Sequence, residues 1–190
     1  MNFVRIITLV NLVWVLSEVG LVLFTRRERR GARPPRDRGS RTLFWCVIGA
    51  GLAAGTAAQA VSAARIRMPE PWLLGASLAL LTAGLAIRWT AILTLGRYFN
   101  TTVIIQPHHR LIRTGLFRLV RHPSYSGLLL LFIGTGLSYG NWLSLGVIVL
   151  PFLAALLYRI HVEEASLVEV LGPEYVDYCR STKRLLPGIY

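Results

Sequence analysis

The stretch YSGLLLLFIGTGLSYGNWLSLGVIVLPFLAALLY, residues 125–158, contains two apolar runs on either side of Gly140-Asn141. A glycine-asparagine pair indicates a tight turn, and a helix needs about 20 apolar residues to cross the hydrocarbon core of a bilayer. The stretch therefore predicts a helical hairpin in a membrane, with helices over Tyr125–Tyr139 and Trp142–Tyr158. The first helix is short for a span, so we expect it to tilt, to kink at its glycines or to lie partly within protein.

Three further apolar runs precede this hairpin, at Phe3–Phe24, Leu43–Ala64 and Trp72–Leu95. Of the 190 residues, 54% are hydrophobic and 16% are charged, whereas about 25% are charged in soluble proteins. We predict an all-α integral membrane protein with about five transmembrane helices. One domain is the natural interpretation of this length.

Basic residues flank the apolar runs unevenly. The loop 25–41 carries eight arginines and two acids, the segment 96–124 carries five arginines and no acids, and the loop 65–71 has a net charge of only +1. By the positive-inside rule the first two are cytoplasmic and the third is external. We therefore expect the N-terminus outside and the C-terminus inside, which in a prokaryotic cell means the inner membrane.

A net charge of +12 is compatible with nucleic-acid binding, but the clustering of charge beside apolar runs indicates membrane topology, so we expect no nucleic-acid partner. The basic 25–41 loop either serves topology alone or also binds anionic membrane lipids. Cys46 and Cys179 have no zinc-like spacing. The adjacent His108-His109 pair lacks a nearby carboxylate, so we expect no metal site either.

Charged residues near the helix ends each leave two interpretations open. Arg88, inside the third run, either extends toward the interface or faces inward with a functional or packing role. The sequence Arg121-His122-Pro123-Ser124-Tyr125 is either an interfacial anchor or a helix start that binds an anionic group. Arg159 and Glu163 share a helix face four residues apart, with Glu164 about 100° round. They form either one exposed ion pair or a pocket with two charges.

Several motifs of the second half of the chain occur together and in order. They are Phe99-Asn100, Gln106, His109 to Ile112, Gly115-Leu116-Phe117, Arg121 to Gly127, Arg159-x-x-x-Glu163-Glu164-x-Ser-Leu, Leu171-Gly172-Pro173-Glu174-Tyr175-x-x-Tyr178 and Arg184-Leu185-Leu186-Pro187. Over roughly half of its length, the chain thereby resembles the isoprenylcysteine carboxyl methyltransferase family of membrane methyltransferases.

The resemblance implies S-adenosylmethionine as methyl donor, in a cytoplasmic site formed by helix ends and their connecting loop. It implies Arg159 and Glu163 as catalytic residues, with Arg159 also orienting the acceptor carboxylate. Phe117 stands where the family often has tyrosine, so it offers no hydroxyl there. The implied cofactor contacts are Gln106, His109, Arg110, Leu111, Ile112, Phe117, His122, Pro123, Ser124, Tyr125, Glu163 and Glu164.

The family's function implies methyl transfer to a lipophilic or prenylated acceptor, such as the carboxylate of an isoprenylcysteine. Residues 1–95 would then supply transmembrane helices, and residues 96–190 the catalytic region. An amine or thiol acceptor is an alternative within the superfamily, and for an amine His161 is the obvious candidate base. A NADPH-dependent enzyme resembling sterol reductases, or a non-catalytic membrane protein, are further alternatives. The spacing from Arg159 to Glu163-Glu164 favours the methyltransferase.

Overall fold

The structure is a computed structural model that describes residues 3–27, 39–99 and 111–190. Within these ranges the regular secondary structure is helical, which confirms the expected all-α class. Gln106, His109 and Arg110 lie outside the described residues. The α-helices are α1 (Phe3–Arg27), α2 (Ser40–Ala58), α3 (Glu70–Leu95), α4 (Pro123–Ser138), α5 (Trp142–Leu171) and α6 (Pro173–Ser181), and the short 3-10 turns are η1 (Ser62–Ala64), η2 (Gly96–Tyr98) and η3 (Gly115–Arg118).

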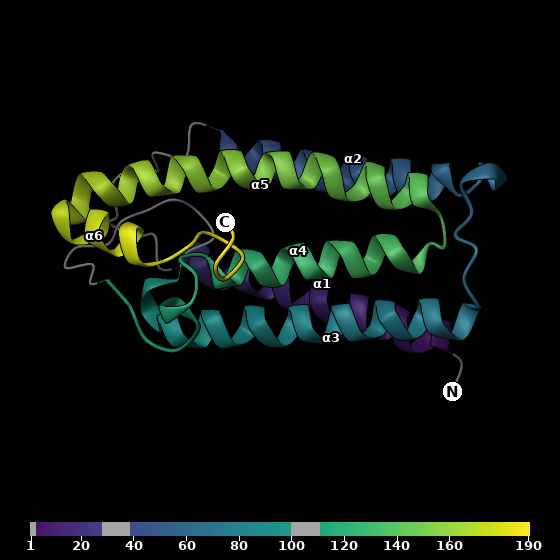
Figure 1. The fold of residues 1–190 in the computed structure, drawn as a ribbon, viewed down its shortest axis with the longest axis horizontal. Helices are drawn as coiled ribbons and strands as arrows, with labels where there is room; N and C mark the ends of the chain where they lie inside the picture. Colours follow the sequence, from purple (N-terminus) through teal and green to yellow (C-terminus); the bar gives the residue numbers. More distant parts are fainter. Residues whose placement is uncertain (1–2, 28–38, 100–110) are drawn as a thin grey trace.

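Helices α1 to α5 lie side by side along the long axis of the molecule (Figure 1), and the short α6 caps one end. Helix α3 packs against α4 and α1, while α5 packs against α2 and α4. The end that holds α6 also holds the last turns of α1, α3 and α5 and the first turns of α2 and α4. Helix ends therefore meet beside α6, where polar side chains could form a common site.

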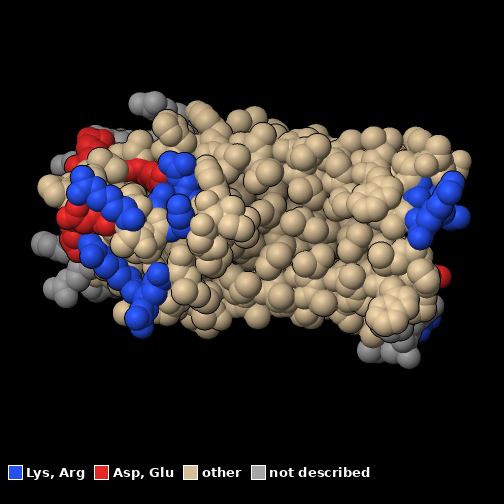
Figure 2. Space-filling view, in the orientation of Figure 1, with Lys and Arg blue, Asp and Glu red and all other residues tan. Residues whose placement is uncertain are grey.

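Three described helices are long and apolar enough to cross a membrane, at Arg5–Leu23, Glu70–Leu95 and Trp142–Leu171. The apolar part of α2, Thr42–Ala58, and the 16 residues of α4 are shorter. Figure 2 shows a broad uncharged middle with charged side chains gathered toward the two ends. These features support a membrane protein, whereas the count of five spans stays a prediction.

The predicted hairpin is present. Gly140 adopts a positive φ of 64° between α4 and α5, a conformation that glycine reaches without steric cost. The Asn141 side chain then accepts hydrogen bonds from the backbone N–H groups of Leu143 and Ser144, at 2.9 and 3.1 Å, and so caps α5. Helix α5 runs unbroken for 30 residues, about 45 Å, so its polar last third extends beyond a hydrocarbon core of about 30 Å.

The second apolar helix is shorter than its sequence suggested. We expected it to reach Ala64, but α2 ends at Ala58 and a 3-10 turn follows at Ser62–Ala64. The chain leaves the helix because it binds the α4–α5 turn. Asn141 Nδ2 donates to the Val61 carbonyl at 2.9 Å, and the Ile66 N–H donates to the Gly140 carbonyl at 2.8 Å.

Helices α3 and α4 approach each other most closely at Gly84 and Gly127. A Cβ atom on Gly127 would lie 2.7 Å from the Gly84 carbonyl oxygen and 2.8 Å from the Arg88 backbone nitrogen. Small residues allow such close backbone contact in membrane helices. Leu81 and Leu131 are fully buried in the same interface, which brings α3 against the first turns of α4.

We predict that Gly127→Ala destabilises the protein, by about 1–3 kcal/mol, because the methyl group meets backbone atoms that cannot move aside easily. Gly146→Ala on α5 is the matched control, since a Cβ there meets nothing within 4 Å. The control should be neutral or slightly stabilising, as alanine favours helix over glycine. Thermal unfolding of the detergent-purified variants measures both effects, and equal behaviour of the two would contradict the close approach.

Candidate functional site

A buried ion pair lies between α1 and α3. Arg88 is 4% exposed and Glu18 is 8% exposed. Arg88 Nη2 donates to Glu18 Oε2 at 2.6 Å, and Arg88 Nε donates to Glu18 Oε1. Trp14 Nε1 also donates to Glu18 Oε1, at 3.2 Å. The interpretation of Arg88 as a side chain that extends to the interface is therefore wrong, because its guanidinium turns inward to meet a carboxylate.

Arg88 also contacts the first turn of α4. Its Nη1 donates to the Ser124 hydroxyl at 2.8 Å and lies 3.4 Å from the Ser124 carbonyl oxygen. A buried charge is costly unless it is paired and hydrogen-bonded, and charged side chains inside membranes usually have a functional role. Arg88 of α3 therefore connects Glu18 of α1 to the turn at the start of α4 that contains Ser124.

That turn, His122 to Tyr125, begins α4 with Pro123 at the first helical position, as the sequence predicted. The His122 carbonyl accepts hydrogen bonds from the Tyr125 and Ser126 backbone N–H groups, at 2.9 and 3.1 Å. The His122 and Tyr125 rings stack with centroids 5.5 Å apart. His122 and Tyr125 therefore leave the same turn side by side, and each binds a different residue of α5.

The Tyr125 hydroxyl joins the two predicted catalytic residues. It accepts a hydrogen bond from Arg159 Nε at 2.9 Å and donates one to Glu163 Oε2 at 2.6 Å. Arg159 is 4% exposed, and its guanidinium carbon lies 5.7 Å from the centroid of the Phe44 ring on α2. The alternative of an exposed surface ion pair is wrong, because Arg159 is enclosed by α2, α4 and α5.

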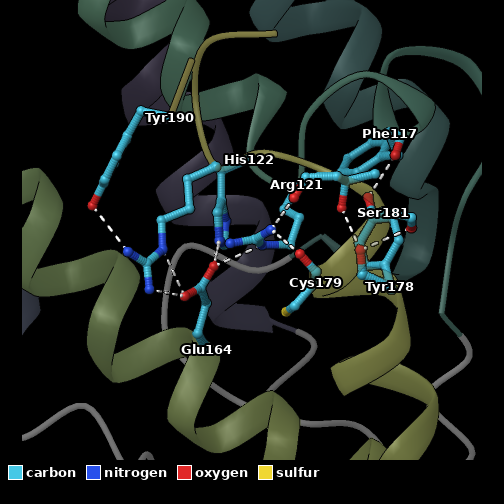
Figure 3. A network of polar contacts seen from close by, with 10 residues as sticks. Phe117, Arg121, His122, Glu164, Tyr178, Cys179, Ser181 and Tyr190 are labelled. Carbon is cyan, nitrogen blue, oxygen red and sulfur yellow. Dashed lines mark hydrogen bonds and ion pairs between the residues drawn. The ribbon is translucent and has the colours of Figure 1, made fainter. Parts of the chain in front are cut away.

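Glu164 lies at the centre of a second cluster, shown in Figure 3. Its Oε1 contacts Arg121 Nε at 2.9 Å and His122 Nε2 at 3.2 Å, and its Oε2 accepts from Arg184 Nε at 2.9 Å. Burial raises the pKa of this carboxyl, but the hydrogen bonds from His122, Arg184 and Arg121 outweigh it and lower the pKa to about 2. Glu164 lies 22 residues, about 33 Å, along α5 from Trp142, beyond the apolar part of the helix.

Backbone contacts extend the Glu164 cluster into the C-terminal segment. The Arg121 and His122 N–H groups donate to the carbonyls of Lys183 and Arg184, at 2.7 and 3.0 Å. The Ser126 hydroxyl donates to the Leu185 carbonyl at 2.6 Å. Residues 183–185 thus run beside the turn that begins α4 and are hydrogen-bonded to it.

The predicted site residues fall into groups. Tyr125, Arg159 and Glu163 form one network, and His122 and Glu164 belong to the other. Pro123 and Ser124 are buried at the start of α4. Among the expected residues just before it, Leu111 and Ile112 are half-buried, and Phe117 is buried in η3 with its carbonyl accepting from Tyr178 Oη at 2.6 Å.

Sequence reasoning did not predict the partners of four residues that the structure places in or next to these networks. Arg121 and Arg184 belong to the motifs quoted from the sequence. The sequence did not indicate that both bind the same carboxylate, that of Glu164. Glu18 and Arg88 were the conspicuous charges of two apolar runs. Their opposite signs were the available signal, because two unlike charges in separate spans can pair.

Comparisons with known proteins match the part of the chain that contains most residues of both networks. Residues 77–169 match the model of the isoprenylcysteine carboxyl methyltransferase (ICMT) family, and the match contains α4, most of α5 and both networks' α5 carboxylates. The resemblance expected from the motifs is confirmed: the chain is similar to this family of membrane methyltransferases.

Among individual relatives, the chain is 35% identical over 123 residues to protein-S-isoprenylcysteine O-methyltransferase B of Arabidopsis thaliana, a match covering 62% of this chain and 61% of the relative. It is 33% identical over 120 residues to the protein-S-isoprenylcysteine O-methyltransferase of Rattus norvegicus, covering 42% of that protein.

The fold is similar to a solved structure of the eukaryotic intramembrane Ras methyltransferase ICMT. The TM-score is 0.56 at 33% sequence identity, and the match covers 62% of this chain and 43% of the other. The match therefore spans about two fifths to three fifths of the length of these relatives.

We predict that Arg88→Met destabilises the protein by about 3–5 kcal/mol, because it leaves the Glu18 carboxylate buried without its partner. The double variant Glu18→Gln/Arg88→Met should recover most of that loss, since no unpaired charge remains. Denaturant unfolding in detergent, followed by tryptophan fluorescence, measures both. Arg67→Met, an exposed arginine, is the control. A double variant as unstable as the single one would contradict a buried pair.

Proposed function

We propose that this chain is an integral membrane methyltransferase that transfers a methyl group from S-adenosylmethionine to a lipophilic acceptor, the carboxylate of an isoprenylcysteine-like substrate. The observation that carries the proposal is the position of the Tyr125 hydroxyl, which contacts both Arg159 and Glu163. It brings a cation and an anion to one point beside the His-Pro turn. The similarity to methyltransferases over residues 77–169 supports the same assignment.

Glu163 suits the ammonium group of the cofactor. Its carboxylate is half-buried, and its contact with Tyr125 is a hydrogen bond from a neutral hydroxyl. A carboxylate held in this way keeps its negative charge for an ammonium ligand, and charge-assisted hydrogen bonds of this kind are the strong ones. We assign Glu163 to the cofactor's amino-acid end.

Arg159 suits the acceptor carboxylate. Its Nε donates to Tyr125, which fixes the plane of the guanidinium, and such a planar fork matches a carboxylate bidentately. Phe44 packs over the guanidinium and makes the surroundings apolar, so the interaction with a substrate anion is less screened than in water. We assign Arg159 to holding and aiming the acceptor.

When bound, S-adenosylmethionine supplies an electrophilic methyl group on a positively charged sulfur; transfer to a carboxylate oxygen forms an ester, breaks the sulfur–methyl bond and leaves a neutral thioether. No proton is removed from a carboxylate acceptor, so no general base is needed. The protein has to align the two reactants and exclude water, and positioning of this kind accounts for much of the rate in such reactions.

Three further predicted residues form or hold the turn that bears Tyr125. Ser124 is anchored by Arg88, and His122 by Glu164. Glu164 already contacts three basic side chains. We therefore propose that Glu164 positions the turn, and that the contact with the cofactor comes from its neighbour Glu163.

An amine acceptor is less well supported. It would have to lose a proton, and His161 was the candidate base. His161 is exposed and stands two residues after Arg159 on α5, about 200° round the helix. It therefore faces away from the Arg159–Tyr125 contact, which favours an acceptor that needs no base.

The direct test is calorimetry of the purified protein with S-adenosylmethionine. We predict that Glu163→Gln weakens binding by about 10- to 100-fold, because an ion pair with the ammonium group is lost. Arg159→Lys should leave cofactor binding nearly unchanged and should lower labelled-methyl transfer into a membrane lipid extract by a similar factor, because the planar fork is lost.

Glu70→Gln and Arg67→Lys are the matched controls, since both residues are exposed at the opposite end of the molecule. Normal S-adenosylmethionine binding by a folded Glu163→Gln variant would overturn the cofactor assignment. Binding of NADPH in place of S-adenosylmethionine by the unaltered protein would overturn the methyltransferase assignment.

We also propose that the site faces the cytoplasm, with the N-terminus outside. The helix ends that border the basic stretch 28–38 lie at the same end of the bundle as α6 and the site. By the positive-inside rule this end is cytoplasmic. A membrane-impermeant thiol reagent should therefore label Cys179 in inside-out vesicles and leave it unlabelled in right-side-out vesicles. The reverse pattern would contradict the orientation.

A further inference from the structure

A basic pocket lies beside Arg121 and is lined by residues of the C-terminal segment; Tyr125 and Arg159 are not among its lining residues. Its volume is about 250 Å³, and its lining includes four cationic side chains, Arg121, Arg180, Lys183 and Arg184, with Ile189 and Tyr190 at its edge. Figure 3 shows Arg121, Cys179 and Tyr190 around this region. The proposed methyl transfer leaves this pocket without a role.

The pocket has a surplus of positive charge that is partly fixed in place. Arg121 and Arg184 are held by Glu164, and Arg180 contacts Asp177 at 3.1 Å. The four cations and these two carboxylates leave a net charge of +2. Arg180 and Lys183 are exposed, and the contact of Arg180 with Asp177 is an exposed one, so both side chains can reach a ligand from the surface.

The pocket lies at the level where a membrane begins. Residues 183–185 are hydrogen-bonded beside the first turn of α4. Arg121 and Arg184, which line the pocket, contact Glu164. Glu164 lies about 33 Å along α5 from Trp142, just beyond a hydrocarbon core of about 30 Å. The pocket therefore lies close to the boundary between hydrocarbon and head groups.

Apolar side chains beside the pocket point outward. Ile189 is 75% exposed, Leu186 is 46% exposed and Leu119 is 56% exposed. Leu119 is close to this segment because its neighbour Val120 forms a parallel bridge with Lys183. Cations above an outward-facing apolar surface are the arrangement that suits a lipid with a charged head group and hydrocarbon chains.

We propose that this pocket binds the phosphate of an anionic membrane lipid, with Arg180 and Lys183 contacting the phosphate and Leu119, Leu186 and Ile189 contacting the acyl chains. Basic pockets at the cytoplasmic ends of membrane helices bind such head groups. A lipid in this place would also hold residues 183–185 against Arg121 and His122. The proposal depends on the membrane location and not on methyl transfer.

The test compares the full chain in nanodiscs of phosphatidylcholine alone and of phosphatidylcholine with one quarter phosphatidylglycerol, without S-adenosylmethionine. Native mass spectrometry measures the phosphatidylglycerol retained after release from the disc. The double variant Arg180→Gln/Lys183→Gln should bind it about 30-fold more weakly, from two charges near the membrane surface. Its unfolding temperature in phosphatidylcholine should equal that of the unaltered protein.

The matched control is Arg65→Gln/Arg67→Gln, which removes two exposed charges at the opposite end of the bundle and should retain phosphatidylglycerol nearly as well as the unaltered protein. Equal retention by the two double variants would overturn the proposal. Inorganic phosphate at millimolar concentration should leave the unfolding temperature unchanged. Stabilisation by phosphate as large as that by phosphatidylglycerol would point to a free anion and would overturn the lipid assignment.

Discussion

The ion pair between Glu18 and Arg88 is the constraint on which the site depends. Neither charge can be left alone in an apolar interior, so α1 and α3 are fixed relative to each other in both height and rotation. Arg88 also fixes the start of α4, because it donates a hydrogen bond to the Ser124 hydroxyl. The glycines at 84 and 127 make the contact possible, because they let α3 and α4 approach until the guanidinium reaches the first turn.

The adjacent carboxylates of Glu163 and Glu164, near the end of α5, have different partners. Because successive helix residues point about 100° apart, Glu163 reaches the Tyr125 hydroxyl while Glu164 reaches Arg121, His122 and Arg184. Glu163 accepts a hydrogen bond from a neutral hydroxyl, whereas Glu164 contacts three basic side chains beside the turn. In the proposed function, Glu163 is therefore the residue assigned to binding and Glu164 the residue assigned to positioning.

Local patterns in the sequence predicted much of this fold and some of the site. Apolar run length and Gly140-Asn141 predicted the α4–α5 hairpin, and the spacing of Arg159 and Glu163 placed them on one face. The end of α2 at Ala58 was not predictable, because it depends on Asn141, about 80 residues away in the chain. The inward orientation of Arg88 depends on Glu18, 70 residues earlier. Tertiary pairing of this kind leaves no local periodic signal.

The hydrogen bonds between residues 183–185 and the start of α4 have a consequence for the order in which the protein forms. Arg121 and His122 receive their backbone partners, and Glu164 receives its contact with Arg184, from a segment synthesised after α1 to α5. A nascent chain can therefore insert its helices into the bilayer before the turn at His122 is fixed. The contacts that fix the turn can form only after residues 183–185 have been synthesised.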